Sequence, residues 1–118
     1  MFVTPTKFLQ LVQDCNDISF IKNIKGLCVG GEVFPQELYE QVKQINHSIK
    51  LYNVYGPTET TMWVTEHYIS SVNNIAIGKP LANTQIYILD KNRKPLPIGV
   101  AGELCISGDG VGKGYLNR

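Results

Sequence analysis

The sequence lacks long apolar runs and an excess of either charge. No stretch of its 118 residues is long or apolar enough to cross a bilayer, and the N-terminus has no basic segment leading into an apolar run and a small-residue cleavage site. Eleven basic residues stand against ten acidic ones, a net charge of +1 without a long run of either sign. We therefore expect no membrane span, no export signal, and no nucleic-acid or membrane partner.

Cysteine and histidine are also scarce. Three cysteines, Cys15, Cys28 and Cys105, are odd in number and widely spaced, which fits neither a disulfide framework nor paired zinc ligands. His47 and His67 are isolated from each other and from cysteine or carboxylate at ligand spacing. We expect a reducing, cytoplasmic setting and surface histidines without a metal.

The first half of the chain shows α/β patterning. Thr4-Pro5 is typical of a helix start, and apolar residues then recur at helical spacing, so we expect a helix from about Pro5 to Gln13. Residues 27–29 form a short apolar run before Gly30-Gly31, a helical stripe follows Pro35, and 49–55 is rich in β-branched and aromatic residues. Such a strand–helix–strand unit has parallel strands and a right-handed crossover.

After about Ser71 the helical periodicity disappears. Strand patterns at 85–89 and 103–106 flank a turn-rich segment with two prolines. The alternation of residues 62–65 also predicts a strand. We expect an α/β part at 1–70 and a β-rich part at 71–118, with the seam at the polar cluster 70–74.

Two loops follow the parallel strands of the first half. Ligands of open α/β sheets bind at the carboxyl ends of such strands, which selects residues 30–32 and 55–61. The second loop offers an aromatic ring for a base, a glycine for close approach, hydroxyls for phosphate and a carboxylate for Mg²⁺. From composition alone, a plain turn with Tyr55 at the strand end and a solvated Glu59 stays open.

Two longer motifs carry a family resemblance. Residues 53–61, N-V-Y-G-P-T-E-T-T, resemble the N-x-Y-G-P-T-E-T-T signature of amino-acid adenylation domains in nonribosomal peptide synthetases. Residues 102–116 resemble the G-E-L-x-I-x-G-x-G-[LV]-A-R-G-Y-L core of the same domains, departing from it at Gly112 and Lys113. Residues 4–8, 27–32 and 77–81 are similar as well, so the resemblance to this AMP-binding, adenylate-forming superfamily covers nearly the whole chain.

This resemblance implies a fold and a reaction. The fold would be a flavodoxin-like strand–helix–strand layer of the adenylate-forming fold, followed by a β-rich subdomain segment of the same large domain. The reaction would join an amino acid to ATP as an aminoacyl-adenylate and release pyrophosphate. The aminoacyl group would then pass to the phosphopantetheine of a separate carrier domain.

The resemblance also assigns roles to residues. Tyr55 would stack on adenine, Asn53 would hydrogen-bond its exocyclic amine, and Thr58 would contact the α-phosphate. Glu59 would help to hold Mg²⁺, which makes Thr58 and Glu59 the catalytic pair. Gly31 and Gly56 would lie close to the nucleotide. Six further positions would line the amino-acid pocket: Phe2, Cys28, Gly30, Val54, Met62 and Trp63.

The pocket positions carry no formal charge, so a charged substrate side chain would be costly to desolvate there. Met62 and Trp63 would fill the volume that a large aromatic substrate needs. We therefore expect a neutral, mainly aliphatic amino acid. The implied protein partners are the carrier and condensation domains of the same synthetase and the rest of the adenylation domain.

The family's phosphate loop would precede these residues, and its ribose-binding aspartate and catalytic lysine would follow them. The 118 residues are therefore expected to be a partial fragment that is inactive alone. Two alternatives stay open: an acyl- or aryl-CoA ligase fragment of the same superfamily, and a non-catalytic nucleotide-binding scaffold. The amino-acid type of both motifs disfavours the ligase.

Overall fold

The computed structural model describes residues 1–15 and 17–117. The chain divides into two compact units, which are described separately below. The first unit comprises Met1–Tyr55 and Thr65–Lys79, and the second comprises Gly56–Val64 and Pro80–Arg118. The functional division at residue 70 stays a prediction.

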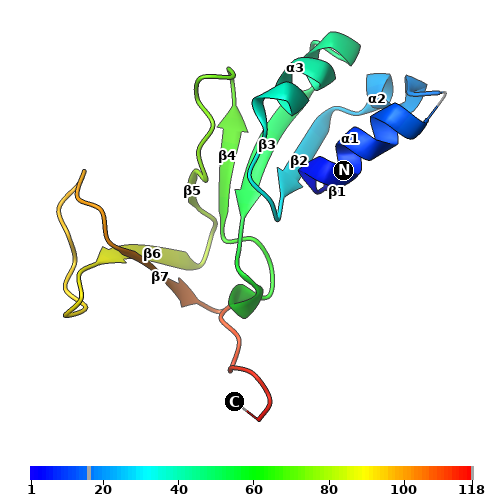
Figure 1. Ribbon diagram of the computed structural model, residues 1–118. Helices are drawn as coiled ribbons and strands as arrows, with labels where there is room; N and C mark the ends of the chain where they lie inside the picture. Colours follow the sequence, from blue (N-terminus) through cyan, green and yellow to red (C-terminus); the bar gives the residue numbers. More distant parts are fainter. Residues whose placement is uncertain (16, 118) are drawn as a thin grey trace. The chain divides into compact units, whose positions relative to one another are not determined.

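The first unit is a sheet with helices (Figure 1). Strands β1, β2 and β3 are parallel, and β4 runs antiparallel to β3, in the order β1-β2-β3-β4-β5. The expected strand–helix–strand unit with parallel strands is confirmed. The elements of this part are β1 (Phe2–Val3), α1 (Pro5–Asp14), α2 (Ser19–Asn23), β2 (Gly26–Gly30), α3 (Gln36–Ile45), β3 (Lys50–Tyr55), β4 (Thr65–Ile69) and β5 (Lys79–Pro80).

Local sequence explains where the two longer helices begin. The Thr4 side chain accepts a hydrogen bond from the Lys7 backbone N–H, and Pro5 occupies the first turn of α1, where no N–H donor is needed. Helix α3 begins directly after Pro35, which has an extended backbone. Both expected helices are confirmed, and α1 continues one residue beyond its expected end at Gln13.

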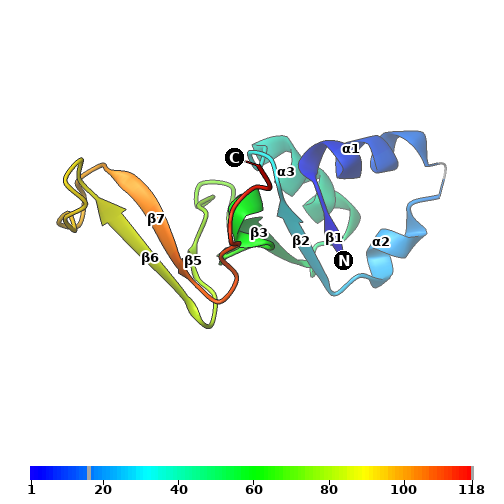
Figure 2. The same ribbon diagram turned by 90° about the horizontal axis from the view of Figure 1, so that it is seen from below.

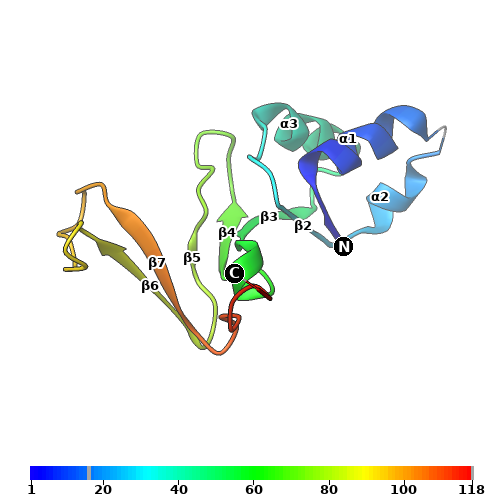
Figure 3. The ribbon, with the colours of Figure 1, turned by 60° about the horizontal axis from the view of Figure 1, so that its bottom comes forward.

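One face of the sheet forms the core. Figures 2 and 3 show α1 and α3 on the same side of β2 and β3. Residues one position apart on a strand point to opposite faces, so the buried set on alternate positions of β2 and β3 faces these helices. The core consists of Phe8, Ile21, Leu27, Val29, Phe34, Leu38, Val42, Ile49, Leu51 and Ile69.

The second unit contains an antiparallel strand pair, β6 (Thr84–Leu89) and β7 (Glu103–Gly108). Both were expected from the sequence, and each is slightly longer than expected. A single 3₁₀ turn, η1 (Thr58–Thr60), lies in the predicted nucleotide loop.

The expected strand at residues 62–65 is wrong except for its last residue. Strand β4 begins at Thr65, because the chain first closes a turn in which Thr61 has a positive φ of 67° and the Met62 N–H bonds to the Thr60 carbonyl. The sequence pattern also missed β1 and α2, because their two and five residues are too few to show a repeating pattern.

No helix within the described residues is long and apolar enough to span a bilayer.

Candidate functional site

Strands β2 and β3 end at the same edge of the sheet, as two parallel neighbours do. Their last paired residues are Gly30 and Val54. A Cβ atom on Gly30 would lie 2.4 Å from the Val54 carbonyl oxygen and 2.6 Å from its Cγ2. Only glycine therefore allows this approach of the two strands beside the predicted pocket.

Four of the six predicted substrate residues lie on one face of this sheet. Phe2 is paired with Cys28 and Gly30 with Val54, and partners in register share a face. This face is opposite to the helix-covered core. Phe2 is 49% exposed, Cys28 is half-buried, and Gly30 and Val54 are buried. The structure thus brings these four together on three adjacent strands.

Glu66 is a further residue of this face that the sequence interpretation missed. It is paired with Val54 across the β3–β4 ladder and is exposed. No sequence pattern identifies Glu66 as a residue of this face, because its place there depends on the antiparallel register of β3 and β4, which was not predicted. It is the carboxylate nearest in register to the four substrate candidates.

The predicted adenine-binding residues lie on the opposite face of β3. Asn53 and Tyr55 alternate with Val54 and share their face with Leu51. Asn53 is 8% exposed, and its Nδ2 donates a 2.8 Å hydrogen bond to the Ala76 carbonyl oxygen. This bond fixes the amide and leaves Oδ1 as the acceptor, which is what an exocyclic amine requires. Tyr55 is half-buried at the strand end.

Gly31 begins the loop after β2 in a left-handed conformation, with a φ of +84°, and is exposed. The next residue ties this loop to α1. The Glu32 carboxylate accepts bonds from the Thr6 hydroxyl (2.6 Å) and the Thr6 backbone N–H (3.1 Å) in the first turn of the helix. The bond from the Thr6 hydroxyl is the larger cause and the bond from the backbone N–H is the second, and together they lower the pKa of Glu32. No pattern in the sequence indicates this contact.

In the second unit, Gly56 permits the predicted nucleotide loop to close. A Cβ atom on it would lie 2.3 Å from the Met62 carbonyl oxygen and 2.4 Å from the Trp63 Cα. Inside the loop, the buried Thr60 hydroxyl lies 2.8 Å from the Pro57 carbonyl oxygen and 2.9 Å from that of Met62. The loop is thus fixed by its own backbone and one buried hydroxyl.

Thr58 and Glu59 project from this loop and are exposed. Glu59 Oε1 accepts a 3.1 Å hydrogen bond from the Tyr115 hydroxyl. That bond and the carboxylate charge raise the pKa of the Tyr115 phenol, because both favour the protonated form. Thr58 thus provides a hydroxyl that suits phosphate, and the adjacent Glu59 provides a carboxylate that suits a hard cation.

The remaining two substrate candidates belong to the second unit. Met62 is 57% exposed and Trp63 is half-buried. Each is therefore accessible enough to contact a ligand, and the following Val64 is buried.

Within the described residues, no three His, Cys, Asp or Glu side chains cluster as a metal site. Mg²⁺ usually keeps several waters and binds one or two carboxylates together with substrate phosphates. Glu59 fits that use as a single protein ligand to a magnesium nucleotide.

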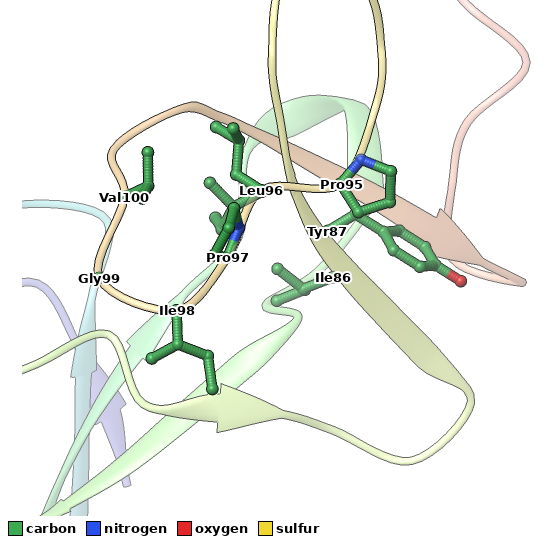
Figure 4. A pocket seen from close by; sticks show the side chains of 9 residues that line it. Ile86, Tyr87, Pro95, Leu96, Pro97, Ile98, Gly99 and Val100 are labelled. Carbon is green, nitrogen blue, oxygen red and sulfur yellow. The ribbon is translucent and has the colours of Figure 1, made fainter.

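A hollow of about 440 Å³ lies elsewhere in the second unit (Figure 4). Its wall comes from β6 and the loop that follows, and is largely apolar. It contains none of the predicted site residues. Its lining residues are Ile86, Tyr87, Ile88, Pro95, Leu96, Pro97, Ile98, Gly99 and Val100.

Related sequences match along the whole chain. Tyrocidine synthase 3 of Brevibacillus parabrevis is 42% identical over 120 residues, which cover 100% of this chain and 2% of that protein. Bacitracin synthase 3 of Bacillus licheniformis is 43% identical over 121 residues, which cover 98% of this chain and 2% of that protein. The chain therefore spans a small part of the relatives that it matches.

Solved structures show the same fold. A four-domain nonribosomal peptide synthetase in its holo form, bound to AMP and glycine, is similar with a TM-score of 0.81 at 37% identity, over 99% of this chain and 8% of that one. A nonribosomal peptide synthetase protein containing adenylation and PCP domains gives a TM-score of 0.82 at 27% identity, over 97% and 24% of the respective chains. The expected mixed α/β fold with a parallel-containing sheet is thereby confirmed.

The sequence profile of the AMP-binding enzymes matches residues 1–116. This match extends over both units and both of the motifs that carry the resemblance. The chain belongs to the AMP-binding enzyme family.

Proposed function

We propose that this chain is the part of an amino-acid adenylation domain that contributes the adenine-binding strand and much of the amino-acid pocket. The intact protein joins an amino acid to ATP, forming an aminoacyl-adenylate and pyrophosphate, and loads the aminoacyl group onto a carrier. The family membership and the similarity to nonribosomal peptide synthetases support this proposal.

One observation of the structure carries it. Strand β3 presents Asn53 and Tyr55 on one face and Val54 on the other. The substrate candidates Phe2, Cys28 and Gly30 share the face of Val54. A single strand can thus serve two ligands from its two faces.

ATP and Mg²⁺ are the proposed nucleotide and cation. Asn53 Oδ1 would accept from the adenine amine, and the Tyr55 ring would stack on the base. Thr58 would donate to an α-phosphate oxygen and Glu59 would bind Mg²⁺, with Gly31 and Gly56 allowing close approach of the backbone. The cation would neutralise charge on the phosphates during transfer.

The proposed substrate is a neutral, mainly aliphatic amino acid. Cys28, Gly30 and Val54 form an uncharged surface, and a charged side chain buried against it would lose hydration without a partner. Glu66 lies next to Val54 on this face, so a preference for a basic amino acid is the result that would contradict this assignment.

The proposed partners are a carrier domain with its phosphopantetheine arm, a condensation domain and the rest of the adenylation domain. The relatives are peptide synthases, and one structural neighbour contains adenylation and PCP domains. A cytoplasmic location remains a prediction from the cysteine content.

Amino-acid-dependent exchange of pyrophosphate into ATP tests the function. The full-length protein that carries these residues is assayed with each of the common amino acids. We expect exchange with a neutral aliphatic one, and loss of most of it in Tyr55→Ala, which removes the proposed adenine stack. Tyr87→Ala is the matched control, because Tyr87 is also an exposed strand tyrosine and lies outside the predicted site.

Exchange with carboxylic acids that lack the amino group would instead favour the acyl- or aryl-CoA ligase. Nucleotide binding without exchange for any acid would favour a scaffold.

A further inference from the structure

We propose that Tyr115 is a positioning residue for Glu59, holding one carboxylate oxygen so that the other is presented to the magnesium ion. This inference rests on the proposed function, because it takes Glu59 as the cation ligand. The two residues lie 56 positions apart in the chain and belong to the two separate sequence motifs.

The side-chain contact involves one of the two carboxylate oxygens of Glu59. The Tyr115 hydroxyl donates to Glu59 Oε1 at 3.1 Å. A carboxylate has two oxygens with about four acceptor sites, so this bond leaves Oε2 for a cation. Because Glu59 is exposed, its unrestrained side chain would sample several rotamers, and binding a cation would cost the entropy of fixing one.

One backbone bond and one bond from a side-chain hydroxyl bring Tyr115 to this position. The Gly112 N–H donates to the Glu59 carbonyl oxygen at 2.7 Å, and the Thr61 hydroxyl donates to the Gly110 carbonyl oxygen at 3.0 Å. The segment from Gly110 to Tyr115 therefore runs along the Thr58–Thr61 loop and is fixed to it at three points. All of these contacts lie within the second unit.

Glycine at position 112 is part of this arrangement. A Cβ atom there would lie 3.2 Å from the Glu59 carbonyl oxygen, and one at Gly110 would lie 3.1 Å from that of Thr60. Both distances are shorter than an ordinary van der Waals contact of a Cβ atom. Position 112 is also one of the two positions at which this sequence departs from the motif that it resembles.

Tyr115→Phe tests the inference, since it keeps the ring and removes only the donor. In the full-length protein we expect the Mn²⁺ dissociation constant, measured by electron paramagnetic resonance with a non-hydrolysable ATP analogue, to rise roughly three- to tenfold. The Mg²⁺ concentration for half-maximal exchange should rise by a similar factor. Affinity for the metal-free nucleotide should not change, which separates positioning from a general structural loss.

Three further variants make the result decisive. Tyr87→Phe is the matched control, because this exposed tyrosine also donates to a side chain, Gln85, away from the loop, and it should leave metal affinity unchanged. Glu59→Gln should weaken metal binding more than Tyr115→Phe does. Gly112→Ala keeps the Tyr115 hydroxyl but crowds Glu59, so a smaller loss is expected.

The outcomes distinguish this inference from the proposed function. Weak metal binding in Glu59→Gln with wild-type affinity in Tyr115→Phe would overturn the positioning role and leave the function standing. Wild-type metal affinity in Glu59→Gln would overturn both the metal assignment and the role of Tyr115. Thermal midpoints of all variants identify any loss that comes from unfolding.

Discussion

The two units of the chain differ in how they are held together. The first unit contains ten fully or nearly fully buried apolar residues from its helices, its strands and the loops between them. In the second unit, among the described residues, Val64 is the buried apolar side chain, while Ile98, Val100 and Leu116 are exposed. Loop geometry there depends on hydrogen bonds and glycines instead. The first unit thus has an apolar core of its own, and the second has far less buried apolar surface.

This difference matters for function because the proposed ligand groups are divided between the units. Asn53 and Tyr55 are placed by a strand whose inner face is packed into a core. Thr58 and Glu59 are placed by a loop that depends on Thr60 and on the 110–115 segment. Packing therefore fixes the first pair, and a few polar contacts fix the second.

Truncation of a core side chain should give the largest effect. Leu27 is fully buried in β2, so Leu27→Ala should lower the free energy of unfolding by about 2–5 kcal/mol. Ile98→Ala, at a fully exposed position in the second unit, should change it by less than about 0.5 kcal/mol. Urea unfolding followed by circular dichroism measures both. Equal effects would contradict the contrast between the units.

Two glycines of β2 differ in the space around them, so replacing each with alanine tests how closely β2 and β3 must pack at the edge of the sheet. In Gly30→Ala the new Cβ would meet the Val54 carbonyl oxygen at 2.4 Å, and separating the strands should cost about 1–3 kcal/mol. Gly26→Ala is the matched control in the same strand, since its nearest neighbour would be the Lys50 carbonyl oxygen at an ordinary 3.9 Å. A Gly30→Ala variant as stable as Gly26→Ala would show that β2 and β3 can relax apart.

The corresponding change in the second unit should act locally. In Gly56→Ala the new Cβ would meet the Met62 carbonyl oxygen at 2.3 Å, so the turn must open. Because this loop adds little to the core, we expect a smaller loss of global stability, about 1 kcal/mol or less. Exchange of the Thr60–Met62 amides, which are bonded within the loop, should become faster. Unchanged amide exchange would show that the loop does not depend on Gly56.

The sequence predicted the parts of the fold that repeat over several residues. Helices α1 and α3 carry full amphipathic stripes, and β3 and β6 are rich in β-branched and aromatic residues, so periodicity and propensity were enough. The motifs likewise selected the residues that are proposed for the candidate site. Neither could show that Val54 lies beside Gly30, because that pairing depends on strand register.

Contacts between distant residues were beyond sequence reasoning. The Tyr115–Glu59 and Thr6–Glu32 bonds join positions 56 and 26 residues apart, and each member is an ordinary polar residue in its own segment. Only the folded backbone brings such pairs together. The sequence marks Glu32 as the end of a glycine loop but does not indicate its partner in α1.

The Thr6–Glu32 contact gives the smallest predicted effect, seen in the pH dependence of stability. The Thr6 donors favour the ionised carboxylate in the folded state, so the pKa of Glu32 is below its ordinary value of 4.5. The contribution is therefore present above that ordinary pKa and is lost as the pH falls through the lower folded value. The urea midpoint of the wild type should fall more between pH 5 and pH 3 than that of Glu32→Gln. Thr6→Val, which removes the hydroxyl but keeps the N–H, should give an intermediate slope, and identical slopes in all three proteins would rule out a role for this contact.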